Sequence, residues 1–194
     1  MKIAILGGTF NPIHLGHIAM AECVLEQTDA EKICFLPNGQ PPHKKGDIIT
    51  DKVHRLKMVE LAIANNPAFF VSTYEILQEK HCYTINTIKY FNSLDDEYSF
   101  IIGADSLFQL SRWKDADELK KICSFIVCDR ANQGNTAKEV ERLKNEGCRI
   151  TMVNMPLVEI DSTSIRERVK NGLDISGYTT PDVIDYIKNN GLYL

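Results

Sequence analysis

The sequence lacks both of the phosphate-binding loops that are easiest to recognise from their spacing. Its 194 residues contain no G-x-G-x-x-G string after a strand-like segment and no G-x-x-x-x-G-K-[ST] string at all. The first pattern marks the turn of dinucleotide-dependent dehydrogenases, and the second marks P-loop NTPases. Both classes of protein are therefore disfavoured.

The chain also lacks long apolar runs, metal-type cysteine spacing and an excess of positive charge. No segment approaches the ~20 apolar residues of a membrane span, and the first apolar run is broken at Gly7 and Gly8, too early for a signal peptide. None of the six cysteines belongs to a C-x-x-C pair, and the formal net charge of -4 gives no reason to expect a nucleic acid or an anionic membrane. We expect a cytoplasmic protein with buried free thiols, a catalytic cysteine being the alternative.

What the chain does have is an alternation of strand-like and helix-like segments. Short apolar runs typical of buried strands lie at residues 1–6, 32–36, 69–73, 98–102, 124–128 and 150–153. Apolar residues with helical spacing fall between them, from Leu15 onward and around residues 56–63, 85–94 and 140–143. This order predicts right-handed βαβ units and an α/β fold, a doubly wound parallel sheet. We expect one domain over residues 1–194, whose C-terminal helical portion, 162–194, holds helices at 162–171 and 180–190.

The stretch GGTFNPIHLGH, residues 7–17, lies where the first strand passes into the first helix. Ligands of open α/β sheets bind beyond the carboxyl ends of the strands. Gly7 and Gly8 lack a Cβ and let a ligand approach the backbone closely. His14 and His17 can point their rings to the same side of a helix start, whose free N–H groups attract an anion. The stretch therefore predicts a phosphate site suited to charge that develops on a phosphoryl group.

Two other interpretations of these histidines need no phosphate. Each histidine could be a solvated turn residue or a helix cap. The pair could also bind zinc, but the sequence shows no obvious third ligand, and catalytic zinc needs three.

A second set of polar residues lies in IDSTSIRERV, residues 160–169. Any of residues 161–163 can cap the helix that follows, and Ser164 with Glu167 has the spacing of a capping box. Capping does not explain Arg166, a cation near the positive end of a helix. A bound polyphosphate would explain it, and an ion pair with a surface carboxylate is the alternative.

Together these stretches resemble the nucleotidyltransferase superfamily with the H-x-G-H motif, which reads HLGH at 14–17 with a second signature, STSIR, at 162–166. More closely, the chain is similar to the family of bacterial nicotinate mononucleotide adenylyltransferases. PPHK at 41–44, GADS at 103–106 and WK at 113–114 follow that family's order. The resemblance covers nearly the whole chain and implies a Rossmann-like nucleotidyltransferase fold.

The resemblance implies a reaction of NAD biosynthesis. The 5′-phosphate of nicotinate mononucleotide attacks the α-phosphate of ATP, which gives nicotinate adenine dinucleotide and pyrophosphate. Mg²⁺ is expected to arrive on the ATP phosphates, with no metal site of the protein's own. The implied partners are these small molecules, with no nucleic acid and no membrane, and a homo-oligomer is left open.

The resemblance also implies roles for individual residues. The residues expected at the reacting phosphates are His14, His17, Lys44 and Arg166. The residues expected to bind ATP are Gly7, Gly8, Thr9, Phe10, His14, His17, Gly103, Asp105, Ser162, Thr163, Ile165 and Arg166. The residues expected to bind the pyridine mononucleotide are Asn38, His43, Lys44, Tyr83, Thr84, Leu107 and Trp113. Asp105 as a helix cap and Trp113 as a core residue are the alternatives, and residues 37–50 are expected to close over the substrates.

The sequence departs from the family pattern mainly around the expected pyridine pocket. The string R-x-G-x-S-Y-T reads QEKHCYT at 78–84, R-P-G reads RAN at 130–132, and Asp161 stands where a serine is common. These changes leave the choice between an acid and an amide base open. A different phosphate acceptor on the same fold and a nucleotide-sensing module without turnover are also left open. The acidic balance opposes a nucleic-acid-binding protein.

Overall fold

The structure is a computed structural model that describes residues 1–39, 49–130 and 134–194. Its strands are β1 (Lys2–Gly8), β2 (Lys32–Pro37), β3 (Phe69–Val71), β4 (Glu97–Gly103), β5 (Ser124–Arg130) and β6 (Arg149–Met155). Its helices are α1 (Leu15–Gln27), α2 (Lys52–Ile63), α3 (Thr84–Phe91), α4 (Ala104–Gln109), the short 3-10 helix η1 (Leu110–Arg112), α5 (Ala116–Ile122), α6 (Gly134–Asn145), α7 (Ser162–Lys170) and α8 (Pro181–Asn189).

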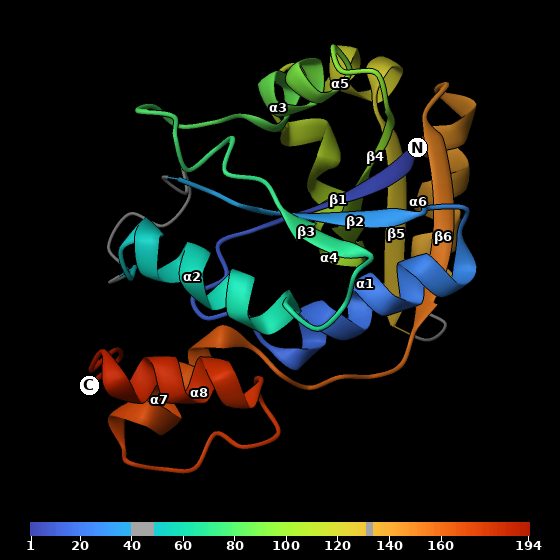
Figure 1. Cartoon of the computed structure of the whole chain (residues 1–194). Coiled ribbons are helices and arrows are strands. Elements are labelled where there is room, and N and C mark those ends of the chain that lie inside the picture. The colour runs from blue at the N-terminus through green and yellow to red at the C-terminus, as the bar shows by residue number, and fades with distance from the viewer. Residues whose placement is uncertain (40–48, 131–133) are drawn as a thin grey trace.

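The strands form one parallel sheet in the order β3-β2-β1-β4-β5-β6 (Figure 1). The predicted doubly wound α/β fold is therefore confirmed. The chain winds outward in one direction from β1 to β3 and in the other from β4 to β6. The order reverses between β1 and β4, which pair directly through Leu6 and Ile101. In such sheets, ligands bind beyond the carboxyl ends of the strands at this switch point.

Side chains along each strand alternate between two cores, as the period of a strand requires. In β1, Ala4 and Leu6 belong to one cluster of buried residues, and Ile3 and Ile5 belong to the other. The first cluster includes residues of α1, α2, α7 and α8, and the second includes residues of α3, α4, α5 and α6. Helices therefore cover both faces of the sheet (Figure 1).

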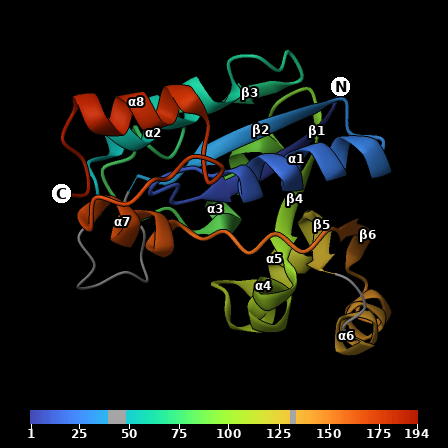
Figure 2. The ribbon, with the colours of Figure 1, turned by 90° about the horizontal axis from the view of Figure 1, so that it is seen from below.

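The C-terminal helices lie against the start of the chain. Figure 2 shows α8 beside α2, and the two helices are in contact. The Ser162 hydroxyl donates to the carbonyl oxygen of Pro12, and the Thr179 hydroxyl to that of Ile13, each at 2.9 Å. Residues far apart in the sequence thus meet at the turn between β1 and α1.

Several element boundaries differ from those predicted. Strand β1 continues through Gly7 and Gly8, which the sequence placed in the turn. Helix α3 ends at Phe91 rather than near residue 94, and Leu94 is an exposed residue. Helix α5 was not predicted, because seven residues are too few for a clear helical period.

None of the helices in the described part of the chain is both long and apolar enough to cross a bilayer.

Candidate active site

The last two residues of β1 are glycines, and each lies close to an aromatic ring. A Cβ added at Gly8 would lie 2.9 Å from the Phe10 ring, and one added at Gly7 would lie 3.0 Å from the Phe100 ring. Phe10 has a φ of +49° and a side chain in the core, with only 2% of the residue exposed. The two glycines are therefore needed to make room for these rings, whether or not a ligand also approaches their backbone. Phe10 can offer a ligand its backbone but not its side chain.

The two histidines of the first motif face one another at the start of α1. His14 is the N-cap of the helix, and the centres of the His14 and His17 rings lie 3.7 Å apart. This confirms that the two rings lie on the same side. The rings of Phe10 and His17 pack edge to face, with 4.9 Å between their centres. The three side chains thus hold one another in place.

The protonation of His17 follows from its neighbours. Its Nδ1 accepts the backbone N–H of His14 at 3.3 Å. Burial, and secondly the nearby His14, lower the pKa of His17 well below its ordinary value. His17 is therefore neutral near pH 7. Because Nδ1 is an acceptor, the ring proton lies on Nε2, which makes Nε2–H a hydrogen-bond donor.

The start of α7 corrects one assignment made from the sequence. Asp161 is the N-cap, and its carboxylate accepts the backbone N–H of Ser164 at 2.9 Å and the Ser164 hydroxyl at 2.7 Å. The two bonds from Ser164 lower the pKa of Asp161. The proposed capping box of Ser164 with Glu167 is wrong, because Ser164 is the third residue of the helix rather than its cap.

Arg166 lies one turn into α7 and reaches back to the first motif. Its Nη1 donates to the carbonyl oxygen of Asn11 at 2.9 Å, and its Nη2 donates to the Thr163 hydroxyl at 3.2 Å. No carboxylate among the described residues pairs with Arg166, so the ion-pair alternative is not supported there. A guanidinium has five N–H donors, so the two bonds leave donors for an anion.

Three residues of the site were missed by the sequence analysis. The Asn11 side-chain oxygen accepts the Tyr193 hydroxyl at 3.1 Å and the backbone N–H of Thr50 at 3.3 Å. Burial raises the pKa of Tyr193 to about 12, so its hydroxyl keeps its proton. Arg55 is only 1% exposed and donates to residues of two loops, the one after β1 and the one between β2 and α2. Its position on the buried face of α2, one turn before Met58, was an available signal.

The end of β4 lies next to the end of β1 in the sheet. Gly103 is the N-cap of α4, so the alternative that Asp105 caps this helix is wrong. Asp105 is exposed in the first turn of α4. Leu107, at 1% exposed, and Ile165, at 0%, are buried in the two cores, so the ligand contacts expected of these residues would not use exposed side chains.

The residues expected at the pyridine ring come from two neighbouring segments. Tyr83 is the N-cap of α3, which begins at Thr84, and the ammonium of Lys114 lies 4.5 Å from the centre of the Tyr83 ring. The segments of Tyr83 and Trp113 are therefore side by side. Trp113 is half-buried and packs against the second core. This contact agrees in part with the alternative that Trp113 is a core residue.

Asn38 connects this side of the site to the first turn. Its side-chain N–H donates to the Thr9 hydroxyl at 3.3 Å. The expected residues His43 and Lys44 lie outside the described residues, as does most of the segment 37–50 that was expected to close.

The described part of the chain contains no group of three or more His, Cys, Asp or Glu side chains that could hold a metal ion. The zinc interpretation thus finds no ligand set there. All six cysteines are free, and burial raises the pKa of Cys34 and Cys128 to about 12. Such thiols stay protonated near pH 7, which disfavours a catalytic cysteine among them.

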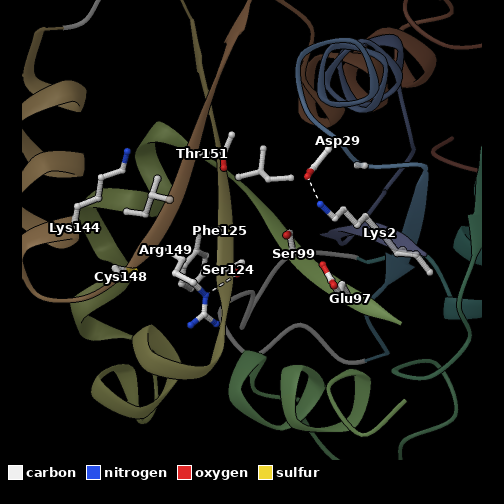
Figure 3. Close-up of a pocket in the computed structure, with 14 residues that line it drawn as sticks. Lys2, Asp29, Glu97, Ser99, Ser124, Phe125, Lys144, Cys148, Arg149 and Thr151 are labelled. Atoms are coloured by element: carbon white, nitrogen blue, oxygen red, sulfur yellow. Dashed lines mark hydrogen bonds and ion pairs between the residues drawn. The ribbon is translucent and has the colours of Figure 1, made fainter. Parts of the chain in front are cut away.

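A cavity of about 500 Å³ lies at the amino ends of the strands, at the other end of the sheet from the motif residues (Figure 3). Its lining includes Lys2, Ser124 and Arg149, near the amino ends of β1, β5 and β6, and none of the motif residues. Lys2 pairs with Asp29, and Arg149 donates to Ser124. The chemistry of the motifs and the switch point, rather than cavity size, therefore locates the candidate active site at the carboxyl ends of β1 and β4.

Comparison with known proteins shows which family the chain belongs to. A family model described as cytidylyltransferase-like matches residues 5–168. A probable nicotinate-nucleotide adenylyltransferase of Caldicellulosiruptor bescii is 41% identical over 195 residues, with 100% of this chain and 99% of the relative covered. A protein of the same name from a Thermoanaerobacter species is 42% identical over 200 residues, with 100% of this chain and 94% of the relative covered.

The fold is also that of solved structures. The Plasmodium falciparum nicotinic acid mononucleotide adenylyltransferase complexed with NaAD superposes with a TM-score of 0.81 and 21% identity, over 99% of this chain and 97% of that chain. At that identity the likeness concerns the fold alone. On the family model and the full-length relatives, the chain belongs to the cytidylyltransferase-like family and, within it, to the nicotinate-nucleotide adenylyltransferases.

Proposed function

We propose that this protein joins ATP and nicotinate mononucleotide to give nicotinate adenine dinucleotide and pyrophosphate, as the names of its relatives indicate. The observation that carries the proposal is the cluster at the first turn. The rings of His14 and His17 lie against each other at the start of α1, and Arg166 of α7 is bonded to the backbone of Asn11. The cluster lies at the switch point of the sheet, where this fold binds its ligands.

The proposed reaction needs no nucleophilic side chain. A phosphate oxygen of the mononucleotide forms a bond to the α-phosphorus of ATP, and the bond from that phosphorus to the bridging oxygen breaks. The pyrophosphate leaves with the bonding electrons. Positioning and stabilisation of the developing charge are the main contributions that a protein makes to such a transfer.

The geometry supports a specific role for each charged or polar group. The neutral His17 can donate from Nε2–H to the α-phosphate without needing to be protonated first. Arg166 can use its remaining donors on the β- and γ-phosphates and on the leaving pyrophosphate. Ser162 and Thr163 begin the same helix, although the Ser162 hydroxyl already donates to Pro12.

In this proposal, Mg²⁺ arrives bound to the phosphates of ATP. The described residues offer no cluster of ligands for a metal of the protein's own. Mg²⁺ keeps several waters and binds readily through substrate phosphates. In this proposal the ATP phosphates and water hold the Mg²⁺.

The proposed pyridine pocket lies between the segments of Tyr83 and Trp113. The backbone N–H groups around Tyr83 and Thr84, at the start of α3, suit a carboxylate. Cys82 stands where the family commonly has a serine, so nicotinamide mononucleotide is kept as a second candidate substrate. The cytoplasm is the proposed location, because Cys34, Cys123, Cys128 and Cys148 are buried free thiols that suit a reducing compartment.

The experiment that tests the proposal is pyrophosphate release with ATP and Mg²⁺, compared between nicotinate mononucleotide and nicotinamide mononucleotide. We expect release with the acid. Equal release with the amide would support the second candidate as well. Release with neither mononucleotide would contradict the proposal and direct the search to other phosphate acceptors.

A further inference from the structure

A buried arginine that has no ion-pair partner among the described residues connects the loops of the candidate active site. Arg55 of α2 is the bulkiest of the fully buried side chains that the structure describes. Its Nε donates to the carbonyl oxygen of Thr50 at 3.0 Å. Its Nη1 donates to the carbonyl oxygen of Thr9 at 2.6 Å and to the side-chain oxygen of Asn38 at 3.3 Å. Its Nη2 donates to the carbonyl oxygens of Asn38 and Gly39 at 2.7 and 3.0 Å.

Such a side chain is costly to bury. Burial lowers the pKa of Arg55, but an arginine stays charged in a protein. The Asp51 carboxylate favours the charged form from a distance, but it makes no ion pair with Arg55. A buried charge without a directly paired opposite charge is tolerated only when its donors are satisfied. The donors of Arg55 are used on four loop residues, and the planar guanidinium fixes the directions of these bonds. A lysine in its place could keep the charge but not the set of directions.

The hydrogen bonds of Arg55 reach both loops of the proposed active site. Thr9 belongs to the turn expected to bind ATP, and Asn38 belongs to the loop expected to bind the mononucleotide. A single rigid group thus joins the two loops, and the Asn38 side chain adds a direct bond to Thr9. Gly39 and Thr50, the other two acceptors, lie on either side of residues 40–48.

We propose that Arg55 is a positioning residue that fixes the ATP-binding turn relative to the mononucleotide-binding loop. The inference rests on the proposed function. Arg55 acts through the loops and does not contact either substrate. Its loss should therefore leave the binding of each substrate alone nearly intact. The reaction of the two together should suffer, because misplacement of reacting groups by about 1 Å can cost on the order of 100-fold in rate.

The test compares Arg55→Met and Arg55→Lys with a matched control, Lys120→Met. Lys120 is also a buried cation, paired with Glu146 and Asp117 and bonded to none of the site loops. For each protein we would measure kcat and two binary affinities by calorimetry, one for a non-hydrolysable ATP analogue with Mg²⁺ and one for nicotinate mononucleotide. All measurements are made well below the melting temperature of each variant.

We expect Arg55→Met to lose about 100-fold in kcat, with both binary affinities within about threefold of those of the wild type. Arg55→Lys should lose kcat by less than Arg55→Met, because lysine keeps the charge but not the fixed bond directions, and it carries the same test if Arg55→Met does not fold. Lys120→Met should lose stability but keep kcat within about twofold.

Three results would overturn the inference. The first is unchanged kcat in both Arg55 variants. The second is an equal loss of kcat in Lys120→Met. The third is a loss of binary affinity as large as the loss of kcat. Absence of turnover in the wild type would instead refute the proposed function, so the two failures are distinguishable.

Discussion

At the scale of single residues, His17 shows how neighbours set the chemistry of a side chain. The backbone N–H of His14 donates to Nδ1, so the proton of the neutral ring lies on Nε2. Burial, together with the nearby His14, disfavours the charged form. The sequence predicted two histidines on the same side of the helix start. It could not predict the lowered pKa, because that depends on atoms from other parts of the fold.

This lowered pKa predicts a dependence of stability on pH. The pKa of His17 in the folded protein lies below the value of about 6.5 in the unfolded chain. As the pH falls below that value, the unfolded chain binds a proton that the folded protein does not. The contribution of His17 is therefore fully present above about pH 6.5, and up to about 1.4 kcal/mol per pH unit is lost below it.

We expect the free energy of unfolding of the wild type to fall more steeply between about pH 7.5 and 5.5 than that of His17→Asn. Urea denaturation at a series of pH values measures both slopes. Parallel curves for the two proteins would contradict the lowered pKa.

Residue-scale prediction from the sequence succeeded where spacing sets geometry and failed where packing does. The HLGH spacing predicted which rings lie together. The burial of Leu107 and Ile165 could not be read from a motif, because it depends on which face of each helix meets the sheet. Tyr193 carries no sequence signal, since only the folded chain brings the penultimate residue to Asn11.

At the scale of elements, the start of α7 determines where Arg166 lies. Asp161 caps the helix through the backbone N–H of Ser164, and Arg166 follows just over one turn later. Local sequence predicted the helix and three candidate caps. The geometry selects Asp161, which also accepts the Ser164 hydroxyl.

We expect Asp161→Ala to lower the free energy of unfolding by about 1 kcal/mol, the usual loss on removal of an N-cap. Asp161→Asn should recover most of that loss, because asparagine caps nearly as well as aspartate. Glu167→Ala is the control, since Glu167 would matter only in the rejected capping box. Denaturant unfolding of the three variants gives the comparison, and a larger loss in Glu167→Ala than in Asp161→Ala would contradict the assignment.

The order of the elements was predictable because a buried strand appears in the sequence as a short apolar run, and a helix appears as apolar residues spaced three or four apart. Short elements were not: α5 has seven residues, and β3 has three. The strand order was also beyond local sequence, since it depends on which strands pair.

At the scale of the whole molecule, the C-terminal portion is bonded to the first turn of the chain. Three consecutive carbonyl oxygens, at residues 11–13, accept side-chain donors from Arg166, Ser162 and Thr179. Residues of α7 and α8 also contribute to the first core. Residues 162–194 thus support the same turn that presents His14 and His17.

This arrangement predicts that residues 162–194 unfold together with the sheet. Hydrogen exchange followed by mass spectrometry at low denaturant concentrations measures the free energy of opening for each segment. Peptides from α8 and from β1 should reach the same opening free energy as denaturant is added. Opening of α8 at a clearly lower free energy, with β1 still protected, would show that the C-terminal portion is a separate unit.

The most direct test of the proposed chemistry at the switch point is the formation of nicotinate adenine dinucleotide by the wild type and by His17→Ala. The wild type, with ATP, Mg²⁺ and nicotinate mononucleotide, should form the dinucleotide and pyrophosphate in equal amounts. His17→Ala should be slower by about 10²–10³-fold, the usual effect of losing one transition-state donor. A matched variant, His54→Ala, removes a histidine of α2 that bonds to Tyr186 and should keep its turnover. No dinucleotide from the wild type, or undiminished turnover in His17→Ala, would contradict the account.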